Sequence, residues 1–184
     1  ADEKPLKICI FTATGDTYEL TATIESSGTA IYSISYNDLD GDGRTELVVG
    51  WRVGTELQAL TVYALRPDGP TELLRTDYVK YGIVDLDENQ MEDLVVLRSL
   101  PDGEGCAEYY VWQDGGLVSR SMARVSMTMA ELSQQGRLTQ GTLRGGEPAL
   151  FVTGVVESAQ TVTDILAMRN GELTNIVLSA ATGV

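Results

Sequence analysis

The sequence contains no histidine and only two cysteines among its 184 residues. The absence of histidine excludes histidine-based catalytic triads, histidine general bases and zinc sites with histidine ligands. Two cysteines, Cys9 and Cys106, are too few for a four-thiolate metal site, and they could form one disulfide or none. The remaining chemistry therefore rests on carboxylates, amides and backbone oxygens.

Long apolar runs and basic residues are also scarce. No segment approaches the ~18 apolar residues of a membrane-spanning helix, and the first four residues lack the apolar core of a signal peptide. A secreted protein that has lost its signal would look the same. Lysine and arginine total 13 against 27 acids, a net charge of −14. That charge repels phosphate backbones and anionic lipids, which excludes nucleic acid and favours divalent cations or basic surfaces as partners.

Apolar residues recur with a period of two through most of the chain, which predicts an all-β fold. In the segment 32–36, Tyr32, Ile34 and Tyr36 alternate with serines, as in a half-buried strand. Short continuous apolar runs are typical of strands buried on both faces. These runs are Leu47-Val48-Val49, Leu94-Val95-Val96-Leu97 and Ala149-Leu150-Phe151-Val152.

Turn signals separate these strands at a steady interval. Glycines at 15, 69, 115 and 171 each adjoin Asp or Asn, and they lie 54, 46 and 56 residues apart. A repeat of about 50 residues is the size of one four-stranded propeller blade. We therefore expect a propeller-like array of about three and a half repeats: a half blade at 1–29 (one outer hairpin), then blades at 30–78, 79–135 and 136–184. The stretch 123–135 fits no copy well, and both a helical turn and a strand extension are compatible with it.

The first full repeat carries an acidic segment with oxygen ligands at alternate positions. The expected calcium ligands are Asp38, Asp40, Asp42, the carbonyl of Arg44 and Glu46. Calcium takes hard oxygen ligands at roughly 2.3–2.6 Å, and Gly43 permits the sharp turn that such a loop needs. Carboxylates crowded together repel one another unless a cation lies between them. This is no EF-hand, because its twelfth position is Val49; the competing interpretation is a solvated acidic turn.

A second segment repeats this pattern 47 residues later. Its expected ligands are Asp85, Asp87, Asn89, the carbonyl of Met91 and Asp93. Gln90 stands where the first loop has glycine, and a left-handed conformation there costs about 1 kcal/mol. A metal-free turn held by Asx hydrogen bonds is the alternative for this loop. The third copy, around residues 142–152, keeps the buried strand but has lost the aspartates.

The segment 37–50, with sequence NDLDGDGRTELVVG, resembles an FG-GAP (VCBS-type) repeat of the kind found in integrin α-chain propellers and bacterial surface lipoproteins. The resemblance is specific over the first copy, fair over the second and only topological over the third. It implies propeller blades, calcium in the loop between the first two strands, and an extracellular or cell-envelope location. The departures are Gln90 and the acids missing from the third copy.

Two functional classes follow from these patterns. The first is a calcium-stabilised binding, adhesion or structural module that meets an unidentified protein or glycan, without catalytic residues. The second is a carboxylate-based glycosidase, for which Glu104, Glu108 and Asp164 are available, although nothing in the sequence places two of them together. Trp51, Trp112, Tyr109 and Tyr110 could stack on sugars, but strand-like surroundings favour packing in the core.

Two further expectations concern the cysteines and the first hairpin. Cys9 and Cys106 fall in repeats that are not adjacent, so we expect two unpaired, buried thiols. The hairpin within 6–24 supplies only half of a four-stranded sheet, which leaves an open edge. We expect an open arc, with Ile8, Ile10, Leu20 and Ile24 packed against the Tyr32–Tyr36 strand; the alternative is a half blade that other residues complete.

Overall fold

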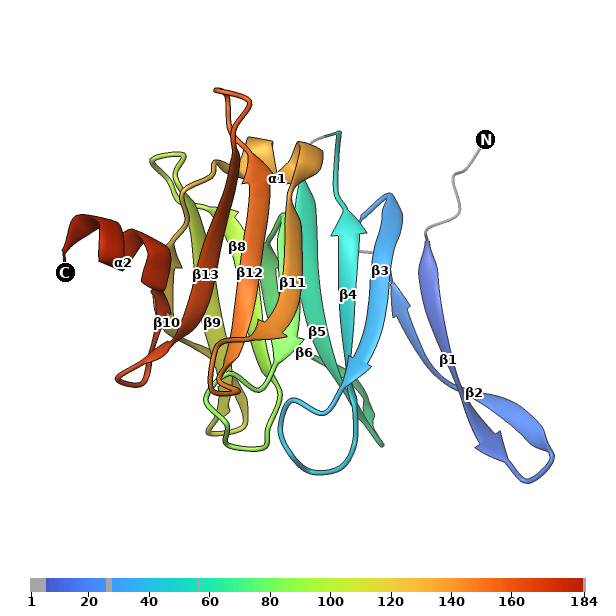
Figure 1. Ribbon diagram of the computed structural model, residues 1–184. Coiled ribbons are helices and arrows are strands. Elements are labelled where there is room, and N and C mark those ends of the chain that lie inside the picture. The colour runs from blue at the N-terminus through green and yellow to red at the C-terminus, as the bar shows by residue number, and fades with distance from the viewer. Residues whose placement is uncertain (1–5, 26–27, 56, 184) are drawn as a thin grey trace. The chain divides into compact units, whose positions relative to one another are not determined.

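The computed structural model describes residues 6–25, 28–55 and 57–183, and they form an all-β protein with two short helices (Figure 1). The expectation of four-stranded antiparallel sheets is confirmed. Contacts divide the chain into two compact units, one containing 1–37 and 44–77 and the other containing 38–43 and 78–184. None of the helices among the described residues is long and apolar enough to cross a membrane.

The first unit contains a two-stranded hairpin and a four-stranded sheet. Each pairs strands that are consecutive in sequence, and the sheet order is β3-β4-β5-β6. The hairpin is β1 (Lys7–Thr14) and β2 (Thr17–Glu25); the sheet is β3 (Ala30–Asn37), β4 (Glu46–Arg52), β5 (Gln58–Arg66) and β6 (Gly69–Asp77). The run Leu47–Val49 lies in β4 and is fully buried, as its continuous apolar character predicts.

The core of the first unit lies between the hairpin and the sheet. Ile8 and Ile24 pack against residues of β4 and β5, namely Leu47, Val49, Trp51 and Tyr63. Trp51 is fully buried, and its indole N–H donates to Thr61 Oγ1 at 2.8 Å. Aromatic packing in the core is therefore confirmed for Trp51, as it is for Tyr109 and Tyr110 in the second unit.

The predicted orientation of the first strand of this sheet is wrong. Tyr32, Ile34 and Tyr36 are exposed, while the alternating residues Ser33 and Ser35 are partly buried. The hairpin does not bury these residues because its strand β2 lies against β6, at the opposite edge of the sheet. Leu20 is exposed for a related reason, since it lies in the part of the hairpin beyond the core formed by Ile8 and Ile24.

The second unit contains two four-stranded sheets that pack on each other. Strand β7 contacts β11 and β10 contacts β14, so corresponding edges of the two sheets meet. The first sheet is β7 (Lys80–Val84), β8 (Asp93–Ser99), β9 (Gly105–Gln113) and β10 (Gly116–Arg124); the second is β11 (Arg137–Thr142), β12 (Pro148–Val155), β13 (Thr161–Arg169) and β14 (Glu172–Asn175). Apolar residues of β8, β9, β12 and β13 form the core between them.

Two seven-residue helices follow the ends of these sheets: α1 (Met129–Gln135) and α2 (Ile176–Thr182). The stretch that fitted no repeat is thus a helix in its second half. A capping box begins α1: the Thr128 hydroxyl accepts from Glu131 N at 3.3 Å, and the Glu131 carboxylate accepts from Thr128 N at 2.8 Å. Met129 and Leu132 anchor this helix in the core.

Hairpin turns lie where the sequence predicts them. The turn residues Asp114 and Gly115 both have positive φ, as do Asn170 and Gly171, which is the requirement of a two-residue type I′ turn. The cysteines differ from expectation in one respect. No disulfide joins the two cysteines, as expected, and Cys106 is buried, but Cys9 is exposed because its side chain lies on the face of the hairpin opposite the Ile8 core contact.

Candidate metal site

The loop between β3 and β4 is organised by its first aspartate. Asp38 accepts hydrogen bonds from two backbone amides, Gly41 N at 2.8 Å on Oδ1 and Gly43 N at 2.9 Å on Oδ2. Asp40 Oδ1 accepts from Asp42 N at 3.0 Å. Leu39 between them is fully buried, which fixes the segment to the protein body. The aspartates of this loop are therefore held by the backbone that surrounds them.

The loop between β7 and β8 is built in the same way. Asp85 accepts from Asn89 N at 3.1 Å and from Gln90 N at 2.9 Å, one on each carboxylate oxygen. Asp87 Oδ1 also accepts from Asn89 N, at 3.2 Å, and Asn89 Oδ1 accepts from Met91 N at 2.7 Å. Leu86 is buried like its counterpart in the first loop.

The backbone conformations of the two loops correspond residue by residue. Gly41 and Gly43 have φ of 75° and 82°, and the residues 47 positions later, Glu88 and Gln90, have φ of 59° and 72°. The predicted left-handed conformation of Gln90 is confirmed. A loop that keeps two left-handed positions without glycine retains this shape at a conformational cost, about 1–2 kcal/mol for each such residue.

Each loop brings three carboxylates together. One oxygen from each of Asp38, Asp40 and Asp42 lies within 4.8 Å of the others, and the same holds for Asp85, Asp87 and Asp93. The remaining predicted ligands differ between the two loops. Glu46 is buried at the start of β4 and is not part of the first group, whereas its counterpart Asp93 is part of the second. Asn89 uses its amide oxygen within the loop, and Arg44 and Met91 were predicted to contribute only their carbonyls.

Electrostatics within the loops reflect this crowding. The pKa of Asp40 is raised, first by desolvation and then by the neighbouring charges of Asp42 and Asp38, although the hydrogen bond from Asp42 N opposes the shift. Burial raises the pKa of Asp93 to about 6, against the hydrogen bonds from Tyr109 and Leu86 that lower it. A cation among these carboxylates would reverse both shifts, because it stabilises the ionised form.

The two loops are neighbours in the second unit. A β-carbon placed at Gly41 would lie 3.4 Å from Cγ and Sδ of Met91, so the side chain of one loop covers the backbone of the other. The third loop differs from both. It is a tight turn in which Leu143 N donates to Glu147 O at 2.8 Å, with positive φ at Gly145 and Gly146. It has no aspartate, as the sequence indicates.

Carboxylates outside the loops have structural partners. Glu108 is buried, and Arg98 Nε donates to it at 2.6 Å, while Asp164 accepts from both N and Oγ of Ser126 at 2.6 Å. Glu104 forms an ion pair with Arg124. Glu104, Glu108 and Asp164 therefore each have a structural partner.

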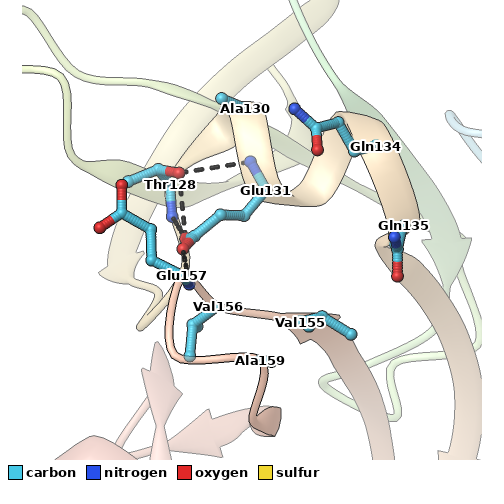
Figure 2. Close-up of a pocket in the computed structure, with 9 residues that line it drawn as sticks. All are labelled: Thr128, Ala130, Glu131, Gln134, Gln135, Val155, Val156, Glu157 and Ala159. Carbon is cyan, nitrogen blue, oxygen red and sulfur yellow. Dashed lines mark hydrogen bonds between the residues drawn. The ribbon is translucent and has the colours of Figure 1, made fainter.

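A surface pocket of about 350 Å³ lies beside α1 and the β12–β13 turn (Figure 2). Its lining includes the carboxylates of Glu131 and Glu157, and Glu131 already accepts hydrogen bonds from Thr128 N, Thr128 Oγ1 and Glu157 N. These bonds lower the pKa of Glu131 and hold the turn against the helix. The Glu131 carboxylate in this pocket is therefore engaged in capping α1, and Figure 2 draws its hydrogen bonds as dashed lines.

One participant in the second loop had no signal in the sequence. Tyr109 lies in β9, sixteen residues after Asp93, and donates its hydroxyl hydrogen to that carboxylate. Only the pairing of β8 with β9, which sets Leu94 opposite Tyr110 and Val95 opposite Tyr109, brings the two groups together.

Comparisons with known proteins add no identification: no family model matches the chain, and no curated protein is significantly similar to it.

Proposed function

We propose that this chain is a calcium-stabilised module of β-propeller type, an open arc of about three and a half blades that binds a protein or glycan at the cell surface. The observation that carries the proposal is the shared geometry of the two acidic loops. Both gather three carboxylates within 4.8 Å, and both keep left-handed residues at the same two positions. The FG-GAP-like segment 37–50 supports the same assignment.

Calcium is favoured over other cations by the donor set. Every side-chain donor in both loops is an oxygen, with no histidine in the chain and no cysteine nearby. Hard, flexible oxygen shells suit calcium, whereas zinc prefers nitrogen and sulfur. Backbone amides already hold Asp38 and Asp85 in place, so a cation would meet carboxylates that are ordered before it binds.

The partners of the remaining acids favour a binding or structural role over catalysis. The acids considered for glycoside hydrolysis are engaged with Arg98, Arg124 and Ser126. Retaining and inverting glycosidases need two carboxyls facing one another across a substrate, about 5 to 9.5 Å apart. Acids that are already paired are poorly suited to glycoside hydrolysis. We therefore propose that the module binds its partner through its surface.

The test is thermal unfolding of the full chain with calcium, with magnesium and with a chelator. A ligand that binds only the folded state stabilises it by about 2.7 kcal/mol at a hundredfold excess over Kd. We expect calcium to raise Tm and the chelator to lower it, with a smaller effect of magnesium. Isothermal titration calorimetry then gives the number of sites.

Variants assign the effect to the loops. Asp40→Asn should remove the contribution of the first loop and Asp87→Asn that of the second. Asp68→Asn is the matched control, because Asp68 lies in a hairpin turn outside both loops and should leave the calcium response unchanged. Identical melting curves with calcium and with chelator in the unsubstituted chain would refute the proposal.

A further inference from the structure

A pocket of about 390 Å³ lies within the first unit, between the hairpin β1–β2 and the turn that joins β5 to β6. All of its lining residues fall between positions 10 and 70, in the two stretches of chain that form this unit. Its volume is near the lower end of the range for small-molecule sites, about 300–1,000 Å³. The size therefore suits a compact ligand rather than a protein surface.

One part of the lining is an apolar wall, formed by Ile10, Leu65, Pro67 and Pro70. Ile10 and Leu65 are partly buried and pack against the core of the unit, so this wall is backed by fixed side chains. The two prolines flank the β5–β6 turn and carry no backbone N–H that would need a partner. The wall can therefore cover the apolar part of a ligand and remove it from water.

Two arginines, Arg44 before β4 and Arg66 at the end of β5, also line the pocket. Within 6–25, 28–55 and 57–183, no acid lies at ion-pair distance from Arg66. The planar guanidinium group of arginine matches a carboxylate with two parallel hydrogen bonds. The pocket is therefore a positively charged place on an acidic chain, and its charged ligand group is an anion.

Two threonine hydroxyls in the lining restrict the ligand further. Thr21 Oγ1 donates to Ile10 O at 3.2 Å, and Thr12 Oγ1 lies 3.0 Å from Thr21 Oγ1. Each hydroxyl has a single hydrogen, so Thr12 must be the donor in the bond between them. Both hydrogens are then used within the hairpin, and the two oxygens offer only lone pairs. They call for a ligand that brings hydroxyl donors.

The charge of the whole chain limits how many negative charges the ligand can carry. The net charge of −14 repels polyanions and acidic protein surfaces. A single carboxylate bound beside two arginines is affected less, because the Debye length is about 8 Å at physiological ionic strength. The favoured ligand is therefore a small monoanion with several hydroxyl groups and an apolar face.

We propose that this pocket binds a carboxylated sugar of the uronic acid class. The carboxylate binds Arg66 and Arg44, the sugar hydroxyls donate to Thr12 and Thr21, and the C–H face of the ring packs on the apolar wall. The inference rests on the glycan-binding role proposed above and names its ligand class. It does not require calcium.

The test is titration of the 184-residue protein with D-glucuronate, with D-glucose and with hexanoate, followed by calorimetry and by amide chemical shifts. Glucose has the hydroxyls without the carboxylate, and hexanoate has the carboxylate without the hydroxyls. We expect glucuronate to bind at least about tenfold more tightly than either, since each lost interaction is a hydrogen bond or a charge-assisted pair. The amides of Thr12, Thr21 and Ala22 should shift on binding.

Arg66→Gln should weaken glucuronate binding by about tenfold or more, and Arg66→Lys, which keeps the charge but loses the planar fork, should fall between the two. Arg144→Gln is the matched control, because Arg144 is exposed in a turn of the second unit and outside the pocket. Thr21→Val should weaken glucuronate about three- to tenfold and leave hexanoate unchanged. Thermal unfolding of each variant verifies that it is folded.

Absence of glucuronate binding would overturn the proposal, as would equal binding of glucose or hexanoate. Equal affinity of Arg66→Gln and Arg144→Gln would overturn it too. Tighter binding of the dipeptide Asp-Glu than of glucuronate would identify an acidic peptide as the ligand and overturn the assignment to a sugar. Titrations with calcium and with chelator separate this inference from the metal sites, because a calcium-dependent Tm without glucuronate binding refutes only the sugar site.

Discussion

The hydroxyl of Tyr109 donates a hydrogen bond to Oδ2 of Asp93 at 2.8 Å, and both residues are buried. The same carboxylate oxygen accepts from Leu86 N at 3.2 Å. Asp93 thus joins the second acidic loop to the core strand β9. The pKa of Tyr109 is raised, chiefly by burial and then by this bond to a carboxylate, so the phenol stays protonated and remains a donor.

The raised pKa of Asp93, about 6 in the folded protein against 3.8 for an ordinary aspartate, predicts a pH effect on stability. Between these values the folded state binds more protons than the unfolded state, so stability falls as pH rises from about 4 to about 6. In the presence of chelator, ionisation of Asp93 should lower the free energy of unfolding by on the order of 2 kcal/mol at pH 7 relative to pH 4. Urea unfolding of the unsubstituted chain and of Asp93→Asn at each pH measures this difference, which is absent if Asp93 titrates normally.

Removal of the Tyr109 hydroxyl should destabilise the fold. Tyr109→Phe leaves Asp93 with one fewer donor in a buried site, which costs about 1–3 kcal/mol. Tyr18→Phe, which removes an exposed hydroxyl, serves as the control and should be neutral. Chemical denaturation at pH 7 gives both values; equal stability of the two variants would show that the hydrogen bond contributes nothing.

Exchanging the residue types at the equivalent left-handed positions should have opposite effects. Gln90→Gly relieves the backbone cost at φ 72° but increases the entropy of the unfolded chain, for a net gain of about 0.5 kcal/mol. Gly43→Ala should lose about 1 kcal/mol from backbone conformation alone, since no atom lies within 4 Å of a β-carbon there. Thermal unfolding with chelator checks both, and destabilisation by Gln90→Gly would contradict the comparison of the loops.

The two cysteines should differ in reactivity. A thiol reagent is expected to modify Cys9 in the folded protein, because its side chain is exposed, and to reach the buried Cys106 only on unfolding. Titration should count one thiol in buffer and two in denaturant. Cys9→Ser should leave none accessible in buffer; two reactive thiols in the folded chain would contradict the burial of Cys106.

Much of the fold was predictable because short-range signals determine it. Continuous apolar runs marked the buried central strands β4 and β8, and Asp-Gly and Asn-Gly pairs marked the turns. The orientation of β3 was not predictable from alternation, since the period of two says which residues share a face but not which face is covered. Tyr32, Ile34 and Tyr36 therefore had the correct spacing and the wrong environment.

The acidic loops were predictable from spacing for the same local reason. Asp38 and Asp85 bind amides within five residues, so their geometry is fixed inside the loop. Glu46 is buried at the start of β4, outside the group of three carboxylates, and Tyr109 had no signal in the sequence of its loop. Both depend on how strands pair and pack, which the sequence of a single loop does not encode.

Every sheet in the described part of this protein pairs only strands that follow one another in the chain. Each ladder therefore closes over a turn or a short loop, and the sequence separation between its partners stays small. Loop-closure entropy is low for such contacts, and rates of folding rise as contact order falls. The meander topology thus makes each sheet a local folding unit, and the longest of these closures within the first full sheet is the acidic loop itself. Ordering of that loop sets the initial cost of joining β3 to β4, so a cation bound there would accelerate folding as well as oppose unfolding.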